Sequence, residues 1–167
     1  MYLQQLLPQE LWYDRDRISD YLKNDKNIFI FLYGNQGEAI GYMFAQPHND
    51  AYKELVNDDP LLKEDNTRFY IDEVVVSPDE RGNGSFLMLI VGFLKEMYKR
   101  GFYKISSHIL TEDYINKYIN RIFKNHLTER RLVRLPSYGN YSYEYIEGEG
   151  IFDDLGSNEK IYGNNET

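Results

Sequence analysis

The distribution of apolar positions along the chain predicts a series of short strands. Residues 28–33 (IFIFLY) and 39–46 (AIGYMFAQ) are rich in apolar and aromatic side chains and flank Gly34-Asn35-Gln36-Gly37, a sequence typical of a hairpin turn. Residues 68–77 (RFYIDEVVVS) carry the strongest strand pattern. The predicted strands occupy residues 1–7, 28–33, 39–46, 68–77, 103–110, 131–135 and 141–146.

Other segments carry apolar residues at helical spacing. Gly101 ends one of these helices, and Thr111 is the expected N-cap of the last one, with acidic residues in its first turn. The predicted helices occupy residues 8–22, 50–56, 84–99 and 112–126. Residues 47–67 form the longest stretch of mainly irregular chain, and loops of that length are usually functional or mobile.

Strands and helices in this order predict an α/β fold with a mixed sheet flanked by helices. A length of 167 residues suits one domain with one core. We expect residues 1–148 to form that domain and residues 149–167 to form an acidic, flexible C-terminal tail, because they are rich in Gly, Asn and carboxylates.

Composition narrows the function. The chain has no cysteine, which excludes disulfides and thiolate metal sites and fits a reducing compartment. His48, His108 and His126 have no metal-ligand spacing, so no metal is expected. No apolar run is long enough to span a membrane, and residues 1–17 do not resemble a signal peptide, so we expect a cytoplasmic protein.

The net charge of −8 argues against broad binding to nucleic acid and favours cationic partners. Residues 121–134 are a local exception because five Lys and Arg side chains gather there. This basic stretch is either a solvated face beside acidic neighbours or a patch for an anionic ligand.

The centre of the chain combines a strand, a glycine-bearing turn and a helix start. Such an arrangement is either a plain tight turn or an anion-binding loop, in which free N–H groups and the helix dipole point at the ligand and glycine allows its close approach. Gly82 and Gly84 would allow the close approach of a ligand, and Arg81 supplies a positive charge. The sequence lacks the Gly-Lys-Ser/Thr of ATP-binding loops, and Leu87 replaces the last glycine of a dinucleotide fingerprint.

The stretch from Val74 to Gly84 (VVVSPDERGNG) resembles the acetyl-CoA-binding motif of the GNAT family of N-acetyltransferases. That motif pairs V-x-V-x-P on a strand with Q/R-x-x-G-x-G/A at a helix start, and the predicted order of elements is similar to the GNAT fold. The resemblance implies that acetyl-CoA is the co-substrate. It also implies cofactor contacts from Val74, Val75, Val76, Arg81, Gly82, Asn83, Gly84, Ser85, Phe86, Leu87 and, on the later helix, Asn116.

Two residues depart from the family pattern. Phe86 replaces the final Gly or Ala of the glycine motif, where its side chain either turns into the core or crowds the pyrophosphate. Phe123 stands where many family members have a tyrosine that protonates the leaving thiolate, and phenylalanine has no proton to donate. Tyr118 would point elsewhere on the same helix, so it is not assigned this role.

Asp72 and Glu73 are adjacent on the strand that precedes the motif. Since neighbouring strand residues face opposite ways, only one of them is expected to face the cleft. The family often has an acidic residue at the position of Glu73, so Glu73 is the expected general base; the alternative is a structural carboxylate paired with Lys or Arg. His108 is expected to be half-buried and structural, and His48 is a candidate substrate contact.

The sequence therefore predicts a GNAT-type N-acetyltransferase that transfers acetyl directly to a cationic primary amine of a small molecule or protein. Phe86 and Phe123 leave open an inactive binding protein with the same fold. Modification of a nucleic-acid base through residues 121–134 is a third possibility, which the net charge disfavours. The chain is expected to act as a monomer or homodimer.

Overall fold

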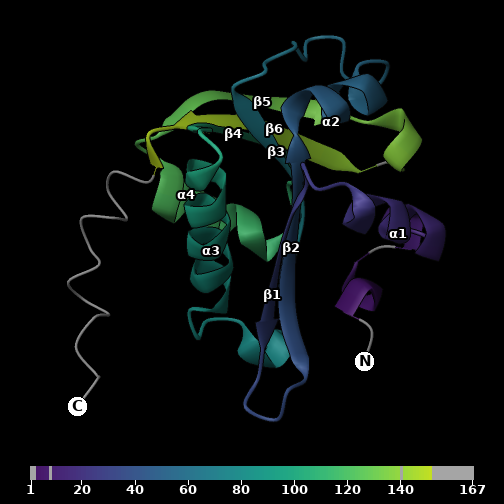
Figure 1. The fold of residues 1–167 in the computed structure, drawn as a ribbon. Coiled ribbons are helices and arrows are strands. Elements are labelled where there is room, and N and C mark those ends of the chain that lie inside the picture. The colour runs from purple at the N-terminus through teal and green to yellow at the C-terminus, as the bar shows by residue number, and fades with distance from the viewer. Residues whose placement is uncertain (1–2, 8, 140, 152–167) are drawn as a thin grey trace.

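The computed structural model describes residues 3–7, 9–139 and 141–151, which form one mixed sheet with helices on both faces (Figure 1). The strands are β1 (Ile28–Tyr33), β2 (Ala39–Pro47), β3 (Arg68–Val76), β4 (Lys104–Leu110), β5 (Leu127–Arg134) and β6 (Ser142–Glu149). The helices are α1 (Arg15–Lys23), α2 (His48–Leu55), α3 (Ser85–Lys99) and α4 (Tyr114–Phe123). Short 3-10 helices lie at Leu3–Leu6, Gln9–Leu11, Pro78–Glu80 and Pro136–Tyr138. The predicted α/β fold is confirmed.

The strands follow the order β1-β2-β3-β4-β6-β5 across the sheet. The central pair, β3 and β4, runs parallel, and its neighbours pair antiparallel. Pairing between β3 and β4 covers three residue pairs, of which Tyr70 and Ser106 form the last. Ser107 Oγ still donates to the carbonyl of Ile71 at 2.8 Å, and beyond this point the two strands diverge. The sheet is therefore split at its centre.

The two faces of the sheet have separate cores. Met43 of β2 is buried in the main core with Phe93 of α3 and Phe123 of α4. The next residue, Phe44, points to the other face and stacks on Tyr21 of α1, with ring centroids 4.7 Å apart. A second, smaller core lies under α2. The two cores approach each other at the split between β3 and β4.

Several predicted boundaries need correction. Residues 3–6 form a 3-10 helix rather than a strand, and α1 begins only at Arg15, where Asp14 accepts a hydrogen bond from the Arg17 N–H at 2.7 Å. The N-cap of α4 is Asp113 rather than Thr111, because Asp113 Oδ1 accepts from the Ile115 N–H at 2.9 Å. Helix α4 ends at Phe123, three residues before the predicted end. The predicted C-terminal tail lies outside the described residues from position 152 onward.

Candidate active site

The turn between β3 and α3 has the geometry of an anion-binding loop. Gly82 and Gly84 both have φ of 86°, a conformation that side chains other than glycine rarely adopt. A Cβ at either position would meet no atom within 4 Å, so backbone conformation alone requires glycine there. The first helical hydrogen bond of α3 runs from the Met88 N–H to the Gly84 carbonyl at 3.0 Å. The N–H groups of Ser85, Phe86 and Leu87 therefore have no partner within the helix.

Phe86 does not cover this loop. Its side chain is 5 % exposed and lies in the main core, where its ring centroid is 5.5 Å from that of Tyr118. The ring points away from the helix start, while the backbone N–H stays among the unpaired donors of the first turn. Of the two orientations that the sequence left open, the structure has the one directed into the core.

The free edge of β3 leads from this loop into the split. Val75 and Val76 are buried and Val74 is half-buried, and Val74 and Val75 line a cavity of about 310 Å³ together with Arg81. The Arg81 Nε donates to the Val76 carbonyl at 3.3 Å, and its guanidinium lies 4.1 Å from the ring centroid of Tyr114. Arg81, Gly82, Asn83 and Gly84 are exposed, and Ser85 is buried at the helix start.

Asn116 lies on the far side of α4 from these groups. Its Oδ1 accepts from Asn120 Nδ2 at 3.0 Å and from Arg130 Nη2 of β5 at 3.4 Å. Asn116 lines neither of the two cavities described here. The structure thus brings together the predicted residues of β3 and the loop, and places Asn116 apart from them.

A second cavity, of about 160 Å³, passes through the split and contains both strand carboxylates. The register of β2 and β3 shifts here: Phe44 pairs with Glu73 and Ala45 pairs with Ile71, so Asp72 is the extra residue of a β-bulge. The expectation that Asp72 and Glu73 face opposite ways is therefore wrong. Because the bulge interrupts the alternation, both line the cavity.

Burial perturbs both carboxyl groups. Loss of solvent raises the pKa of Asp72 to about 7, although hydrogen bonds from Tyr13 and Gln46 act in the opposite direction. Loss of solvent and the charge of Asp72 raise the pKa of Glu73 to about 8, against the hydrogen bond from Tyr42. The Oε1 atom of Glu73 is buried without a hydrogen-bond partner. Within the described part of the chain no Lys or Arg forms an ion pair with either carboxyl, and a bound cation would stabilise the charged form of both.

Aromatic and charged side chains of the N-terminal segment complete the wall of this cavity. The guanidinium of Arg17 bonds to Glu54 Oε2 at 2.6 Å and to the Tyr21 hydroxyl, and lies 4.7 Å from the ring centroid of Tyr13. Arg17 is paired with Glu54, so its charge is largely balanced. The carboxyl groups of Asp72 and Glu73 therefore make the cavity acidic overall. Tyr138 lies opposite, beside the same guanidinium.

The histidines differ from expectation. His48 is 1 % exposed; its Nε2 donates to the Lys63 carbonyl at 2.8 Å, so its Nδ1 accepts from the Ser106 hydroxyl at 2.7 Å. Both ring nitrogens are used, which leaves His48 nothing to offer a substrate. His108 is more buried than expected, at 9 %, and it lines the acidic cavity, bonded to Tyr70 and Asp59.

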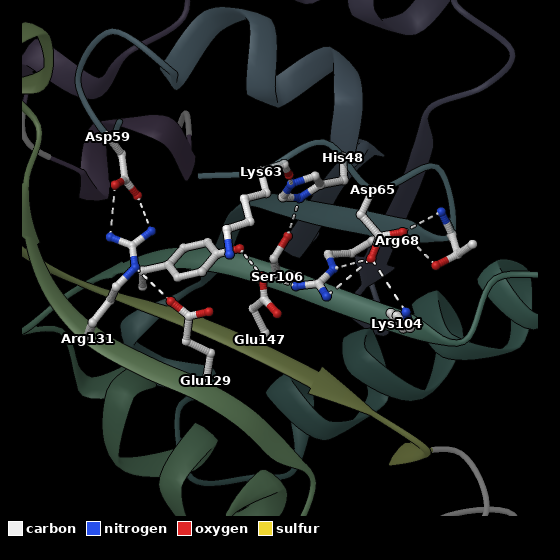
Figure 2. A network of polar contacts seen from close by, with 12 residues as sticks. His48, Asp59, Lys63, Asp65, Arg68, Lys104, Ser106, Glu129, Arg131 and Glu147 are labelled. Carbon is white, nitrogen blue, oxygen red and sulfur yellow. Dashed lines mark hydrogen bonds and ion pairs between the residues drawn. The ribbon is translucent and has the colours of Figure 1, made fainter. Parts of the chain in front are cut away.

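The chain after α2 is anchored to the sheet by its carboxylates (Figure 2). Asp59 pairs with Arg131 of β5, and Asp65 pairs with Arg68 of β3 and with Lys104. Arg68 is also paired with Glu147 of β6. Residues 56–67 are thus held over the sheet by ion pairs from three strands, and the helix predicted over residues 50–56 is present as α2 at residues 48–55.

The basic stretch is partly neutralised within the chain. Arg131 pairs with Asp59 and Glu129, and Arg130 pairs with Glu144 of β6. Arg121, Lys124 and Arg134 remain exposed. Over the described residues no helix is long and apolar enough to cross a membrane, and no group of three or more His, Asp and Glu is arranged to hold a metal ion.

Comparison with known proteins places the chain. The model of the acetyltransferase (GNAT) family matches residues 2–117. A search of curated proteins found no match. Among solved structures, the ribosomal-protein-S18-alanine N-acetyltransferase from Escherichia coli is similar with a TM-score of 0.61 and 13% identity, over 89% of this chain and 83% of that one.

Two further structures were solved with coenzyme A. An aminoglycoside 6'-N-acetyltransferase has a TM-score of 0.59 and 14% identity, over 88% of this chain and 86% of that one. The PaiA N-acetyltransferase from Thermoplasma acidophilum has a TM-score of 0.53 and 12% identity, over 80% and 67%. At these identities the likeness shows the fold alone. The family model, however, spans more than half of the chain, and the protein therefore belongs to the GNAT family of acetyltransferases.

Proposed function

We propose that this protein transfers an acetyl group from acetyl-CoA to a primary amine. One observation carries the proposal: the unpaired edge of β3 connects the glycine loop before α3 with an acidic cavity in the split sheet. An acyl thioester bound along this edge would have its phosphates at one end and its acetyl group at the other. Two structural neighbours solved with coenzyme A support the same substrate class.

In this proposal the cofactor is held by backbone groups. Val74, Val75 and Val76 present the strand edge, and the N–H groups of residues 82–87 bind the pyrophosphate at the start of α3. Arg81 is held beside the loop by its contacts with Val76 and Tyr114. A cofactor contact from Asn116 stays a prediction, and it requires the side chain to give up its bonds with Asn120 and Arg130.

The acidic cavity supports a cationic acceptor. An amine arrives as an ammonium ion and must lose a proton before its nitrogen can attack the thioester. Glu73 is the proposed general base, because its Oε1 has no hydrogen-bond partner. Its pKa is raised to about 8, and a general base works best when its pKa lies near the operating pH. Asp72, beside it, is the proposed binding site for the ammonium charge.

The two departures from the family pattern weigh little against activity. Phe86 is directed into the core and leaves the loop uncovered. Phe123 is 0 % exposed and packs in the main core rather than in either cavity. The inactive binding protein remains the second candidate, and base modification through residues 121–134 is disfavoured because Arg130 and Arg131 are ion-paired.

Titration calorimetry with acetyl-CoA tests the proposal. We expect micromolar binding to the wild-type protein and its loss in Gly84→Trp. Gly101→Trp is a matched control at the opposite end of α3, because Gly101 also has positive φ and open space around its Cβ position. Absence of binding to wild-type protein, or equal loss in both variants, would contradict the proposed cofactor site.

Turnover is then measured as coenzyme A release with a panel of primary amines that includes diamines and lysine peptides. Glu73→Gln is expected to lower kcat by about 100-fold, the usual contribution of a general base. In the wild-type protein kcat/KM should rise with pH through about 8, because Glu73 must be ionised to accept a proton. Binding of acetyl-CoA without release for any amine would favour the inactive binding protein.

A further inference from the structure

Four side chains from four different segments form one hydrogen-bonded line behind the acidic cavity. The Tyr70 hydroxyl of β3 lies 3.0 Å from His108 Nδ1 of β4. The His108 Nε2 lies 3.0 Å from Asp59 Oδ2 in the segment after α2. Arg131 of β5 donates from Nη1 to the other Asp59 oxygen at 2.9 Å, as the facing pair in Figure 2 shows. Tyr70, Asp59 and His108 are buried, with 4 %, 2 % and 9 % exposure.

The positions of the protons follow from the two ends of this line. Burial tends to raise the pKa of Asp59, but hydrogen bonds from His108 and Arg131 outweigh it and lower the pKa to about 2. Asp59 is therefore a carboxylate, which only accepts, so the His108 proton is on Nε2. Burial lowers the pKa of His108, which leaves Nδ1 as an unprotonated acceptor. The Tyr70 O–H thus donates to Nδ1; the backbone N–H of His108 takes up one lone pair of the Tyr70 oxygen, and the other is left for the cavity.

The Tyr70 oxygen is well placed to meet the acceptor. Tyr70 forms the last β3–β4 pair before the strands diverge, two residues ahead of Asp72. Tyr70 and His108 line the same cavity as Asp72 and Glu73. A hydroxyl whose proton is already committed to His108 can only accept a hydrogen bond from a substrate, and an amine nitrogen is a donor.

We propose that Tyr70 accepts a proton from the acceptor amine during acetyl transfer, and that His108, Asp59 and Arg131 are positioning residues that make it able to do so. This inference rests on the proposed function and names a second proton-transfer group for it. The arrangement works like other hydroxyl–imidazole–carboxylate relays. In these the carboxylate fixes which ring nitrogen carries the proton and stabilises the protonated ring.

The proton balance needs such a group. An ammonium acceptor loses two protons on becoming an amide, and Glu73 takes one of them before attack. As the N–C bond forms, the nitrogen becomes positively charged; its second proton passes to the Tyr70 oxygen while the Tyr70 proton moves to His108 Nδ1. The C–S bond breaks with its electron pair on sulfur. The thiolate, whose conjugate thiol has a pKa of ~8.5, then takes the proton back through Tyr70 from the imidazolium, whose ordinary pKa is ~6.5.

Other groups that face the relay act on its charge. Tyr145 of β6 lies with its ring centroid 4.8 Å from that of His108, and Arg131 lies 4.3 Å from the Tyr145 ring. Arg131 disfavours a charged His108, and Asp59 favours it. Around Tyr70, Asp72, Tyr138 and Tyr145 all raise the pKa of the hydroxyl, as burial does first, which keeps it protonated in the resting protein. The ring of His48 lies on its other side, 6.4 Å from that of Tyr70.

The test compares Tyr70→Phe, His108→Gln and the double variant by acetyl-CoA calorimetry and by the pH profile of kcat. Each single variant should bind acetyl-CoA as the wild-type protein does and lose about 100-fold in kcat. The double variant should lose no more than the worse single variant, because the two residues act as one unit. The rise of kcat with pH that reflects His108 should disappear in all three.

His48→Gln is the matched control, since His48 is also buried and also bonded through both ring nitrogens but lies outside the cavity; its pH profile should match the wild type. Labelling the three histidines with ¹⁵N gives a readout without turnover: His108 should be the Nε2–H tautomer, and its Nδ1 shift should change in Tyr70→Phe. Wild-type turnover that Tyr70→Phe leaves intact, or an Nδ1-protonated His108, overturns the relay alone. Failure of wild-type protein to bind acetyl-CoA overturns the proposed function instead.

Discussion

Replacing Asp72 with Asn should stabilise the protein, and the gain should depend on pH. The Asp72 pKa rises from 3.8 to about 7 on folding because the carboxyl is buried in the split sheet. A rise of about three pH units corresponds to about 4 kcal/mol of preference for the neutral form, at about 1.4 kcal/mol per unit. Asn cannot ionise, and its amide oxygen can still accept the hydrogen bond that Gln46 donates to Asp72 at 3.2 Å.

The direction of the effect follows from linkage. Asp72 has a higher pKa in the folded than in the unfolded chain, so the unfolded chain loses its proton first as the pH rises. Ionisation therefore destabilises the fold progressively between about pH 4 and pH 7, and the full cost is present above pH 7. Asp72→Asn should change the free energy of unfolding little at pH 4 and raise it by up to about 4 kcal/mol at pH 8.

Urea unfolding of both proteins at pH 4 and pH 8 measures this difference. Asp79→Asn, an exposed carboxyl in the β3–α3 connection, is the control and should give a difference that is small at both pH values. A gain for Asp72→Asn that is the same at pH 4 and pH 8 would refute the argument, because it would mean that Asp72 ionises in the folded protein as it does in water. Acceptor binding should weaken in this variant while acetyl-CoA binding persists.

Three further predictions concern the core and the buried ion pairs. Phe86→Ala should cost about 3–5 kcal/mol of stability by opening a cavity in the core, without tightening acetyl-CoA binding, as denaturation and calorimetry would show. Phe123→Tyr should lower stability by about 1–3 kcal/mol, because its hydroxyl would be buried in the core, and should leave kcat no higher. Arg68→Met should cost about 3–5 kcal/mol in urea unfolding, because Glu147 loses its buried partner; an unchanged stability would mean that solvent reaches Glu147.

Elements with strong local patterns were predictable from the sequence. The β1–β2 hairpin, β3 and α3 occur within two residues of the predicted positions, because alternation, turn glycines and helix spacing are local signals. The glycine turn before α3 was predictable for the same reason, since two glycines between a strand and a helix indicate a turn with positive φ. The strand predicted over residues 3–6 was wrong, because their apolar run is too short to distinguish a strand from a 3-10 turn.

The acidic cavity was only partly predictable. Glu73 was predicted from the resemblance to the GNAT family, but the bulge that turns Asp72 to the same face is a property of the pairing with β2, which no local pattern records. Asp59, Tyr70, His108 and Arg131 meet only because residues 56–67 fold back over the sheet. Nothing in their spacing along the chain indicates that contact.

The position of Phe123 changes how the missing tyrosine should be understood. A hydroxyl at this position would lie in the main core, 0 % exposed and outside both cavities, so its absence removes no group that faces the split sheet. The groups that line the cavity there include the two carboxyls of the bulge and Tyr70 with its partner His108. In the proposed mechanism, proton transfer therefore depends on β3 and β4, which line the split, and the absence of a tyrosine at position 123 is no argument against activity.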